Sequence, residues 1–139
     1  MCGQVRMRIS APPIITMACH CTGCQKLSAS AFSLTAMIPS AAFEVTKGEP
    51  AIGALHGASR YFYCPNCFNW LFTRPAGMDA FVNVRPTMFD VTAWSTPFIE
   101  SCVSEKLPWA STAAKHSFDR FPAPNQYGEL VADYAAQVR

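Results

Sequence analysis

The seven cysteines of this chain are the residues whose type and spacing most directly suggest chemistry. Cys19, Cys21 and Cys24 lie within six consecutive residues, so three thiols can converge on one metal ion. In an extended C-x-C segment both cysteine side chains share one face, so we expect Cys19 and Cys21 to project together. Gly23 permits a tight turn that brings Cys24 round to join them. Three thiolates on a zinc ion leave its fourth position open, which is typical of a catalytic site.

The pair Cys64 and Cys67 forms a C-P-x-C motif between two predicted strands. We interpret the motif as a knuckle whose two thiolates face one metal ion, with backbone amides near the turn stabilising them. The pair supplies two of four ligands, and Cys2 is the obvious candidate for a third. The sequence therefore predicts a second metal site.

Two alternatives to metal binding exist for these cysteines. A thioredoxin-like redox pair would place Cys64 and Cys67 at the start of a helix in a βαβ unit, whereas strand-like segments flank them here. Cysteines also serve as small buried apolar residues. Two closely spaced clusters in a chain predicted to be cytosolic favour metal binding over both alternatives.

The remaining cysteine and the histidines have simpler interpretations. Cys102 stands alone and is predicted to be a buried thiol of the core or of a strand. His20 lies between two clustered cysteines, but the alternation of an extended segment directs it to the opposite face. We therefore expect it to pack beside the metal site rather than to bind the ion. His56 and His116 are isolated, and a surface or core position is the default for both.

The composition describes a globular chain without a nucleic-acid-binding or membrane-spanning signature. Half of the 139 residues are hydrophobic and 14% are charged, against roughly 25% in average domains, which argues against disorder. The net charge of +2 and the scattered basic residues do not mark a nucleic-acid-binding domain. No apolar stretch of about 18 residues indicates a membrane helix. The N-terminus lacks the apolar core of a signal peptide, so we expect a cytoplasmic location.

Short alternating segments separated by turn signals predict an all-β sheet, sandwich or barrel. The only convincing helix is Tyr127–Val138, where the apolar residues fall on one stripe. No shift in composition marks a boundary, so we expect one domain over residues 1–139. The predicted strands cover residues 5–9, 14–17, 32–38, 43–46, 60–63, 70–73, 81–84 and 98–103.

Taken in order, these motifs resemble the glutathione-dependent formaldehyde-activating enzyme family, whose vertebrate relatives include centromere protein V. The resemblance rests on C-G-Q-V-R at residues 2–6, C-H-C-T-G-C-Q-K at 19–26 and F-Y-C-P-N-C at 62–67. The combination of C-H-C-x-x-C with C-P-x-C at this separation is specific. Weaker elements extend the resemblance to about residue 122 and lie at residues 28–32, 71–72, 87–90, 97–99 and 108–109.

The resemblance implies a mainly β, zinc-binding β-tent fold of short antiparallel strands, with a short C-terminal helix and up to two zinc ions. It assigns Cys19, Cys21 and Cys24 to a catalytic zinc. The implied activity is that of a carbon–sulfur lyase, which joins glutathione to formaldehyde and gives S-hydroxymethylglutathione. The implied partners are a small thiol and a small aldehyde, with no nucleic acid and no membrane. The ligands implied for a structural zinc are Cys2, Cys64 and Cys67.

Three positions depart from the family pattern. The family's first C-x-C has a cysteine two residues before the position of Cys2, so we expect three thiolates in the structural site. Ala29 stands where the family usually has glycine, and Phe68 stands where glycine often follows the knuckle. We expect both to reshape the substrate pocket. Lys26 and Arg60 are candidates for binding the carboxylates of glutathione.

Two functions other than catalysis at zinc stay open. A zinc-stabilised binding or scaffold module would use the same fold, and a fourth protein ligand on the Cys19 cluster would favour it. A thiol redox protein would instead show reversible oxidation of Cys64 and Cys67 without metal.

Overall fold

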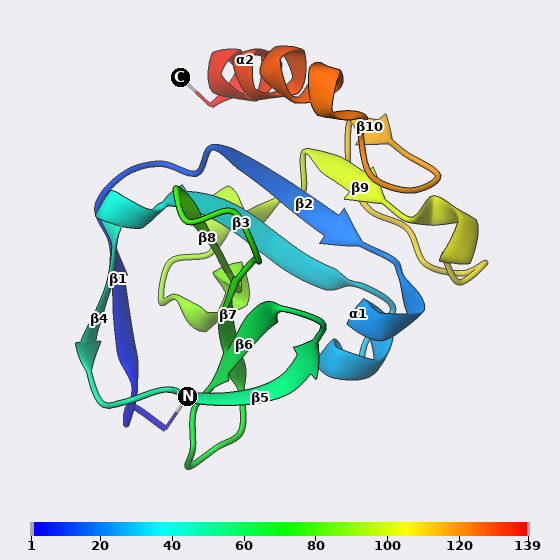
Figure 1. The fold of residues 1–139 in the computed structure, drawn as a ribbon. Coiled ribbons are helices and arrows are strands. Elements are labelled where there is room, and N and C mark those ends of the chain that lie inside the picture. Colours follow the sequence, from blue (N-terminus) through cyan, green and yellow to red (C-terminus); the bar gives the residue numbers. More distant parts are fainter. Residues whose placement is uncertain (1, 139) are drawn as a thin grey trace.

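The structure is a computed structural model that describes residues 2–138; the side chains of residues 54–56, and with them the prediction for His56, lie outside the described part. Within it the chain forms a two-stranded and an eight-stranded sheet (Figure 1), which confirms the mainly β architecture. The strands are β1 (Arg6–Ile9), β2 (Ile15–Cys19), β3 (Ser33–Pro39), β4 (Phe43–Lys47), β5 (Ala51–His56), β6 (Ser59–Tyr63), β7 (Trp70–Arg74), β8 (Phe81–Val84), β9 (Ile99–Ser101) and β10 (His116–Ser117).

Two α-helices and several short 3-10 turns complete the described chain. Helix α1 (Thr22–Ser28) lies directly after β2, and α2 (Tyr127–Gln137) lies beside the β2 and β9 end of the large sheet (Figure 1). Neither helix combines the length and apolarity that crossing a membrane requires. The 3-10 turns cover Ser40–Ala42, Pro86–Met88, Ala93–Ser95, Val103–Glu105 and Pro124–Gln126.

The large sheet has the strand order β10-β9-β2-β3-β8-β7-β6-β5, and β1 pairs with β4 in the small one. Most neighbours are antiparallel, as expected, but β9 is parallel to both β2 and β10. Parallel strands need a long connection, and the chain between β2 and β9 contains β3 to β8. This pairing places Cys19 opposite Ser101. The segment after β9 therefore reaches the first cysteine cluster.

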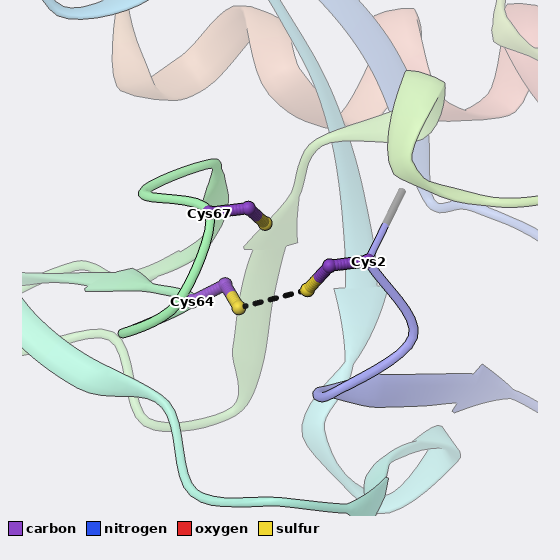
Figure 2. A group of neighbouring side chains, drawn as sticks. All are labelled: Cys2, Cys64 and Cys67. Atoms are coloured by element: carbon purple, nitrogen blue, oxygen red, sulfur yellow. Dashed lines mark hydrogen bonds between the residues drawn. The ribbon is translucent and has the colours of Figure 1, made fainter.

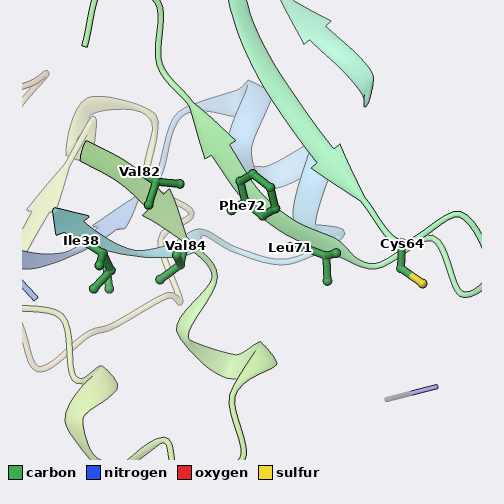
Figure 3. Packing of buried hydrophobic residues seen from close by; sticks show 7 residues of the cluster. Ile38, Cys64, Leu71, Phe72, Val82 and Val84 are labelled. Atoms are coloured by element: carbon green, nitrogen blue, oxygen red, sulfur yellow. The ribbon is translucent and has the colours of Figure 1, made fainter. Parts of the chain in front are cut away.

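Two groups of buried side chains hold the elements together. In the larger group, Ile38, Val82 and Val84 from β3 and β8 have no exposed surface, and Phe72 of β7 packs with them (Figure 3). Cys64 belongs to this group and is only 2% exposed, so the C-P-x-C motif is anchored in the core. The smaller group fixes α2 against the sheet and consists of Ile15, Phe98, Ile99, Leu130 and Tyr134.

The structure departs from the sequence-based prediction in three places. Helix α1 occupies a segment that was expected to turn tightly, so the prediction of a single helix was wrong. The strands β5 and β10 were not predicted, and β5 lacks strong apolar alternation. Strand β9 ends at Ser101 rather than Val103, because Cys102 adopts a left-handed φ of 56° that takes the chain out of the sheet.

We predict that Val82→Ala lowers the free energy of unfolding by about 2 kcal/mol, since it removes fully buried methyl groups and leaves a cavity. Val91→Ala is the matched control, because Val91 is 68% exposed and should change stability by less than about 0.5 kcal/mol. Chemical denaturation of both variants in the same zinc-containing buffer measures the difference. Equal effects would contradict the assignment of this core.

Candidate metal centres

The first cysteine cluster forms where β2 passes into α1. Cys19 is the last residue of β2, and Cys21 is the N-cap of α1, where its Sγ accepts a hydrogen bond of 3.3 Å from the amide of Cys24. The three sulfurs lie within 4.8 Å of one another. The three cysteines therefore converge, as predicted. The first turn of α1 brings Cys24 back to the cluster. A left-handed turn at Gly23 is not involved, since its φ is not positive.

Helix α1 is held in place by groups from the segment after β9. The carboxylate of Glu105 accepts hydrogen bonds from the amide of Thr22 at 2.7 Å and from its hydroxyl at 2.6 Å. Gln25 donates to the backbone oxygen of His20 at 2.6 Å and to that of Glu105 at 3.0 Å. A carboxylate near the first turn of a helix also interacts favourably with the helix dipole. These contacts fix the helical turn that carries Cys24.

The second cysteine cluster joins the knuckle between β6 and β7 to the N-terminal segment. Figure 2 shows the side chains of Cys2, Cys64 and Cys67 pointing toward one another. The sulfurs of Cys2 and Cys64 are 3.5 Å apart. All three sulfurs lie within 4.8 Å of one another. Asn69 closes the knuckle: its backbone oxygen accepts from the amide of Cys64 at 3.0 Å, and its side chain donates to the sulfur of Cys67 at 3.2 Å.

A glycine in the β4–β5 turn allows the N-terminal segment to pack close to the chain. Gly48 has a φ of 73°, and a Cβ at this position would clash with the backbone oxygen of Gln4. Glycine is therefore required here for both its conformation and its small size. The close approach positions the segment that carries Cys2.

Both cysteine clusters fit a metal ion that prefers sulfur ligands. Thiolates bound to a tetrahedral zinc ion at 2.3 Å lie about 3.8 Å from one another, which agrees with sulfurs grouped within 4.8 Å. Soft thiolate ligands favour zinc and other thiophilic ions over magnesium or calcium. The chemistry of the donors and their spacing therefore suit zinc at both clusters.

The protonation of the first cluster also bears on metal binding. A hydrogen bond from Cys24 is the main cause that lowers the pKa of Cys19 to about 5, and it outweighs the effect of burial. The same hydrogen bond raises the pKa of Cys24, together with burial and the charge of Cys19. Burial raises the pKa of Cys21. Because the pKa values of Cys21 and Cys24 are raised, binding of a divalent ion to the three sulfurs releases protons.

Two buried hydroxyls lie beside the sulfurs of the first cluster. The hydroxyl of Ser101 contributes to the lowered pKa of Cys19, and that of Ser33 opposes part of the rise in the pKa of Cys24. Among the described residues, neither hydroxyl has another partner. Hydroxyls that face a sulfur can donate to a thiolate and stabilise its charge, as groups around metal ligands commonly do.

His20 packs beside the first cluster, as the sequence predicted. Its ring is fully buried, and Nε2 lies 3.0 Å from the carboxylate of Glu100. Lys106, Thr112 and Ser117 also donate to this carboxylate, at 2.8–3.1 Å. His20 does not belong to the three-sulfur group. It therefore ties the cysteine segment to β9 rather than joining the sulfurs.

The other isolated residues have the following positions. Cys102 is buried, as predicted, but it lies next to the first cluster: burial and the charge of Cys19 raise its pKa to about 12. His116 is half-buried and lies 3.1 Å from the carboxylate of Asp133. Lys26 and Arg60, the candidates for carboxylate binding, are both exposed.

A cavity of about 400 Å³ lies near the first cluster, although none of the three cysteines lines it. Ser33, next to Cys24, lies in its wall, and the C-terminal part of α1 forms one side. Ala29 and Phe68 both line it, which agrees with the expectation that these two departures reshape a pocket. Both have left-handed backbone, with φ of 48° and 57°. Glycine adopts this conformation most easily.

Sequence reasoning missed Arg85, which lines the same cavity and is 7% exposed. Its guanidinium stacks on the ring of Trp70, with Cζ 3.9 Å from the ring centroid. Burial lowers the pKa of Arg85 to about 10, against the opposing effect of the charges of Cys24 and other neighbours. The side chain thus stays charged at neutral pH. Its position after a predicted strand gave no signal, because strand register alone does not identify which residue faces a cavity.

The fold and the two cysteine clusters define a β-rich protein with two sites suited to metal. The sequence profile of the family described as "Glutathione-dependent formaldehyde-activating enzyme" matches residues 1–105. The chain belongs to this family. A solved structure of a Rhodobacter sphaeroides protein is similar in fold: it is 13% identical, covers 64% of this chain and 83% of its own, and gives a TM-score of 0.54. The comparison with curated proteins returned no match.

We predict that Glu100→Gln destabilises the protein at neutral pH. Burial alone would raise the pKa of Glu100, but hydrogen bonds from Lys106, Ser117, Thr112 and His20 together lower it to about 2, from 4.5. A lowered carboxylate pKa stabilises the fold above about pH 4.5, and this contribution is lost as the pH falls towards 2. The variant should therefore lose about 2–3 kcal/mol at pH 7.

Denaturation of wild type and variant at several pH values measures this difference, which should shrink below about pH 4.5. Glu44→Gln is the control, because Glu44 forms an exposed pair with Arg8 and should cost less than about 1 kcal/mol. A difference that stays constant down to pH 3 would contradict the assigned role of the Glu100 carboxylate.

Proposed function

We propose that this protein is a zinc-dependent carbon–sulfur lyase that adds a thiol, glutathione in the first instance, to formaldehyde or a related small aldehyde. The observation that carries the proposal is the cluster of Cys19, Cys21 and Cys24 beside a cavity of about 400 Å³. Three sulfur ligands leave one position of a tetrahedral ion for a substrate, and the cavity has the size of a small-molecule site. Membership of the family supports the substrate class.

The reaction is an addition without a change of oxidation state. The thiol gives up its proton, its sulfur forms a bond to the carbonyl carbon, and the π electron pair moves to the oxygen, which takes up a proton. A free thiol has a pKa near 8.5 and is mostly protonated at pH 7. A bound zinc ion lowers the pKa of a thiol and polarises a carbonyl oxygen.

The residues of the chain contribute position and electrostatics to this reaction. Cys19, Cys21 and Cys24 would hold the ion next to Ser33, which lines the cavity. The hydroxyls of Ser33 and Ser101 lie beside two of these sulfurs and would disperse their negative charge. Helix α1 and its contacts to Glu105 keep the sulfur cluster in one arrangement. A preorganised cluster spares the reaction the cost of arranging its ligands.

We assign the cluster of Cys2, Cys64 and Cys67 to a structural zinc. Cys64 is packed in the main hydrophobic core, and the cluster ties the N-terminal segment to the knuckle between β6 and β7. A metal at this position connects parts of the chain that are 62 residues apart. Binding energy of a structural zinc contributes directly to folding.

The first prediction from this function is that the zinc-loaded protein accelerates the loss of formaldehyde in the presence of glutathione. NMR follows the formaldehyde signal and the appearance of the hydroxymethyl thioether, with and without protein and with and without glutathione. Cys21→Ser is the inactive control. Binding of glutathione without acceleration would contradict the lyase function and favour the non-catalytic module.

The second prediction separates the two metal centres. Cys21→Ser should lose one zinc ion and the activity while keeping the fold, because serine is also a good N-cap and preserves the start of α1. Cys64→Ser should unfold, because it removes a ligand inside the core. Elemental analysis gives zinc per chain, and circular dichroism with thermal melting gives the fold. If both variants unfold equally, the division into catalytic and structural centres is wrong.

A further inference from the structure

Arg85 places a positive charge in the wall of the cavity beside the first cysteine cluster. The residue follows β8 and is 7% exposed. Its guanidinium lies over the ring of Trp70, the first residue of β7. Stacking on a ring face holds the guanidinium plane fixed and leaves the N–H groups at its edge able to donate.

The hydrogen-bonding capacity of this guanidinium is largely unused. Its Nε is buried and has no partner among the described residues. Its Nη2 donates one long bond of 3.5 Å to the backbone oxygen of Asn83. A guanidinium has five N–H donors, and a buried donor without a partner is costly. Such a group is expected where a ligand supplies the missing acceptors.

The cavity offers no acidic side chain to this charge. Its described lining consists of apolar residues and of neutral polar ones such as Ser30, Asn69 and Thr87. The cysteine cluster supplies negative charge instead, because Cys24 and Cys19 both act on Arg85 through their charges. The wall of the cavity therefore carries Ser33, which neighbours Cys24, and a cation whose Nε–H group lacks an acceptor among the described residues.

We propose that Arg85 binds a carboxylate of the thiol substrate and thereby makes the site specific for thiols that carry one. The inference rests on the proposed function of the Cys19 cluster and adds the determinant of its substrate. The sulfur of the substrate lies at the cluster. The carboxylate of the substrate accepts hydrogen bonds from the N–H groups at the edge of the guanidinium. Planar, bidentate recognition of a carboxylate is what this side chain does best.

Charge balance is the competing role for Arg85. A zinc ion with three thiolates carries one net negative charge, and a nearby guanidinium would offset it. That role needs proximity alone, and it predicts that loss of the charge affects metal retention and every thiol alike. Carboxylate binding instead predicts an effect limited to thiols with a carboxylate. The two roles therefore differ in a measurable way.

The test measures binding of two probes, 3-mercaptopropionate and its neutral counterpart 3-mercaptopropionamide, to the zinc-loaded protein by calorimetry. Wild type should bind the carboxylate about ten- to a hundredfold more tightly, the range typical of a charged hydrogen bond. Arg85→Met should remove this preference and leave binding of the amide and the zinc content unchanged. Arg85→Lys should keep part of the preference, because it retains the charge but not the planar fork.

The control variant is Arg8→Met, which removes an exposed arginine of β1 that pairs with Glu44 and should leave both affinities unchanged. Equal binding of the two probes by wild type would overturn the inference, and this result does not depend on any variant folding. An equal loss of both probes in Arg85→Met would assign Arg85 to charge balance. Failure of wild type to bind either thiol would overturn the proposed function itself, and the inference with it.

Discussion

The parallel pairing of β2 with β9 is the constraint on which the surroundings of the first cysteine cluster depend. It places Cys19 opposite Ser101 and joins segments about 80 residues apart. From this register follow the hydrogen bond between His20 and Glu100 and the contacts of Glu105 with the start of α1. A shift by one residue would turn every side chain of β9 to the other face of the sheet. The cluster is thus local in sequence, but its support comes from a distant strand.

This arrangement explains which parts of the site can be predicted from the sequence. The three cysteines of the first cluster are close in sequence, so their spacing alone indicates that they converge. Arg85 and Glu100 reach the site only through the order and register of strands, which the pattern of one strand does not contain. Cys102 was correctly predicted to be buried, but the sequence does not indicate that it lies next to Cys19 in the fold. Sequence spacing thus predicts the ligands, and topology determines what surrounds them.

The fold itself was predictable where alternation is strong. Each of the eight predicted strands corresponds to an observed one. One buried face imposes a period of two on strands such as β1 and β8, whereas β7 and β9 are buried on both faces. Helix α1 escaped prediction since it has seven residues and no buried side chain. Its stability comes from the Sγ of Cys21 at the N-cap and from the carboxylate of Glu105. Neither a thiol cap nor a capping residue about 80 positions away produces the apolar periodicity by which a helix is predicted from its sequence.

Two residues that line the cavity, Ala29 and Phe68, stand at positions where the resemblance led us to expect glycine. Ala29 and Phe68 both have left-handed backbone and both line the cavity beside Arg85. A side chain in this conformation costs about 1 kcal/mol or more relative to glycine. Other contacts of the fold must offset that cost, so the backbone at these positions is determined by the surrounding structure. With glycine at both positions the cavity would be wider, whereas here Phe68 adds an aromatic side chain to its wall. The same backbone conformation thus supports a differently shaped cavity, and that shape can change without moving the cysteines of the first cluster.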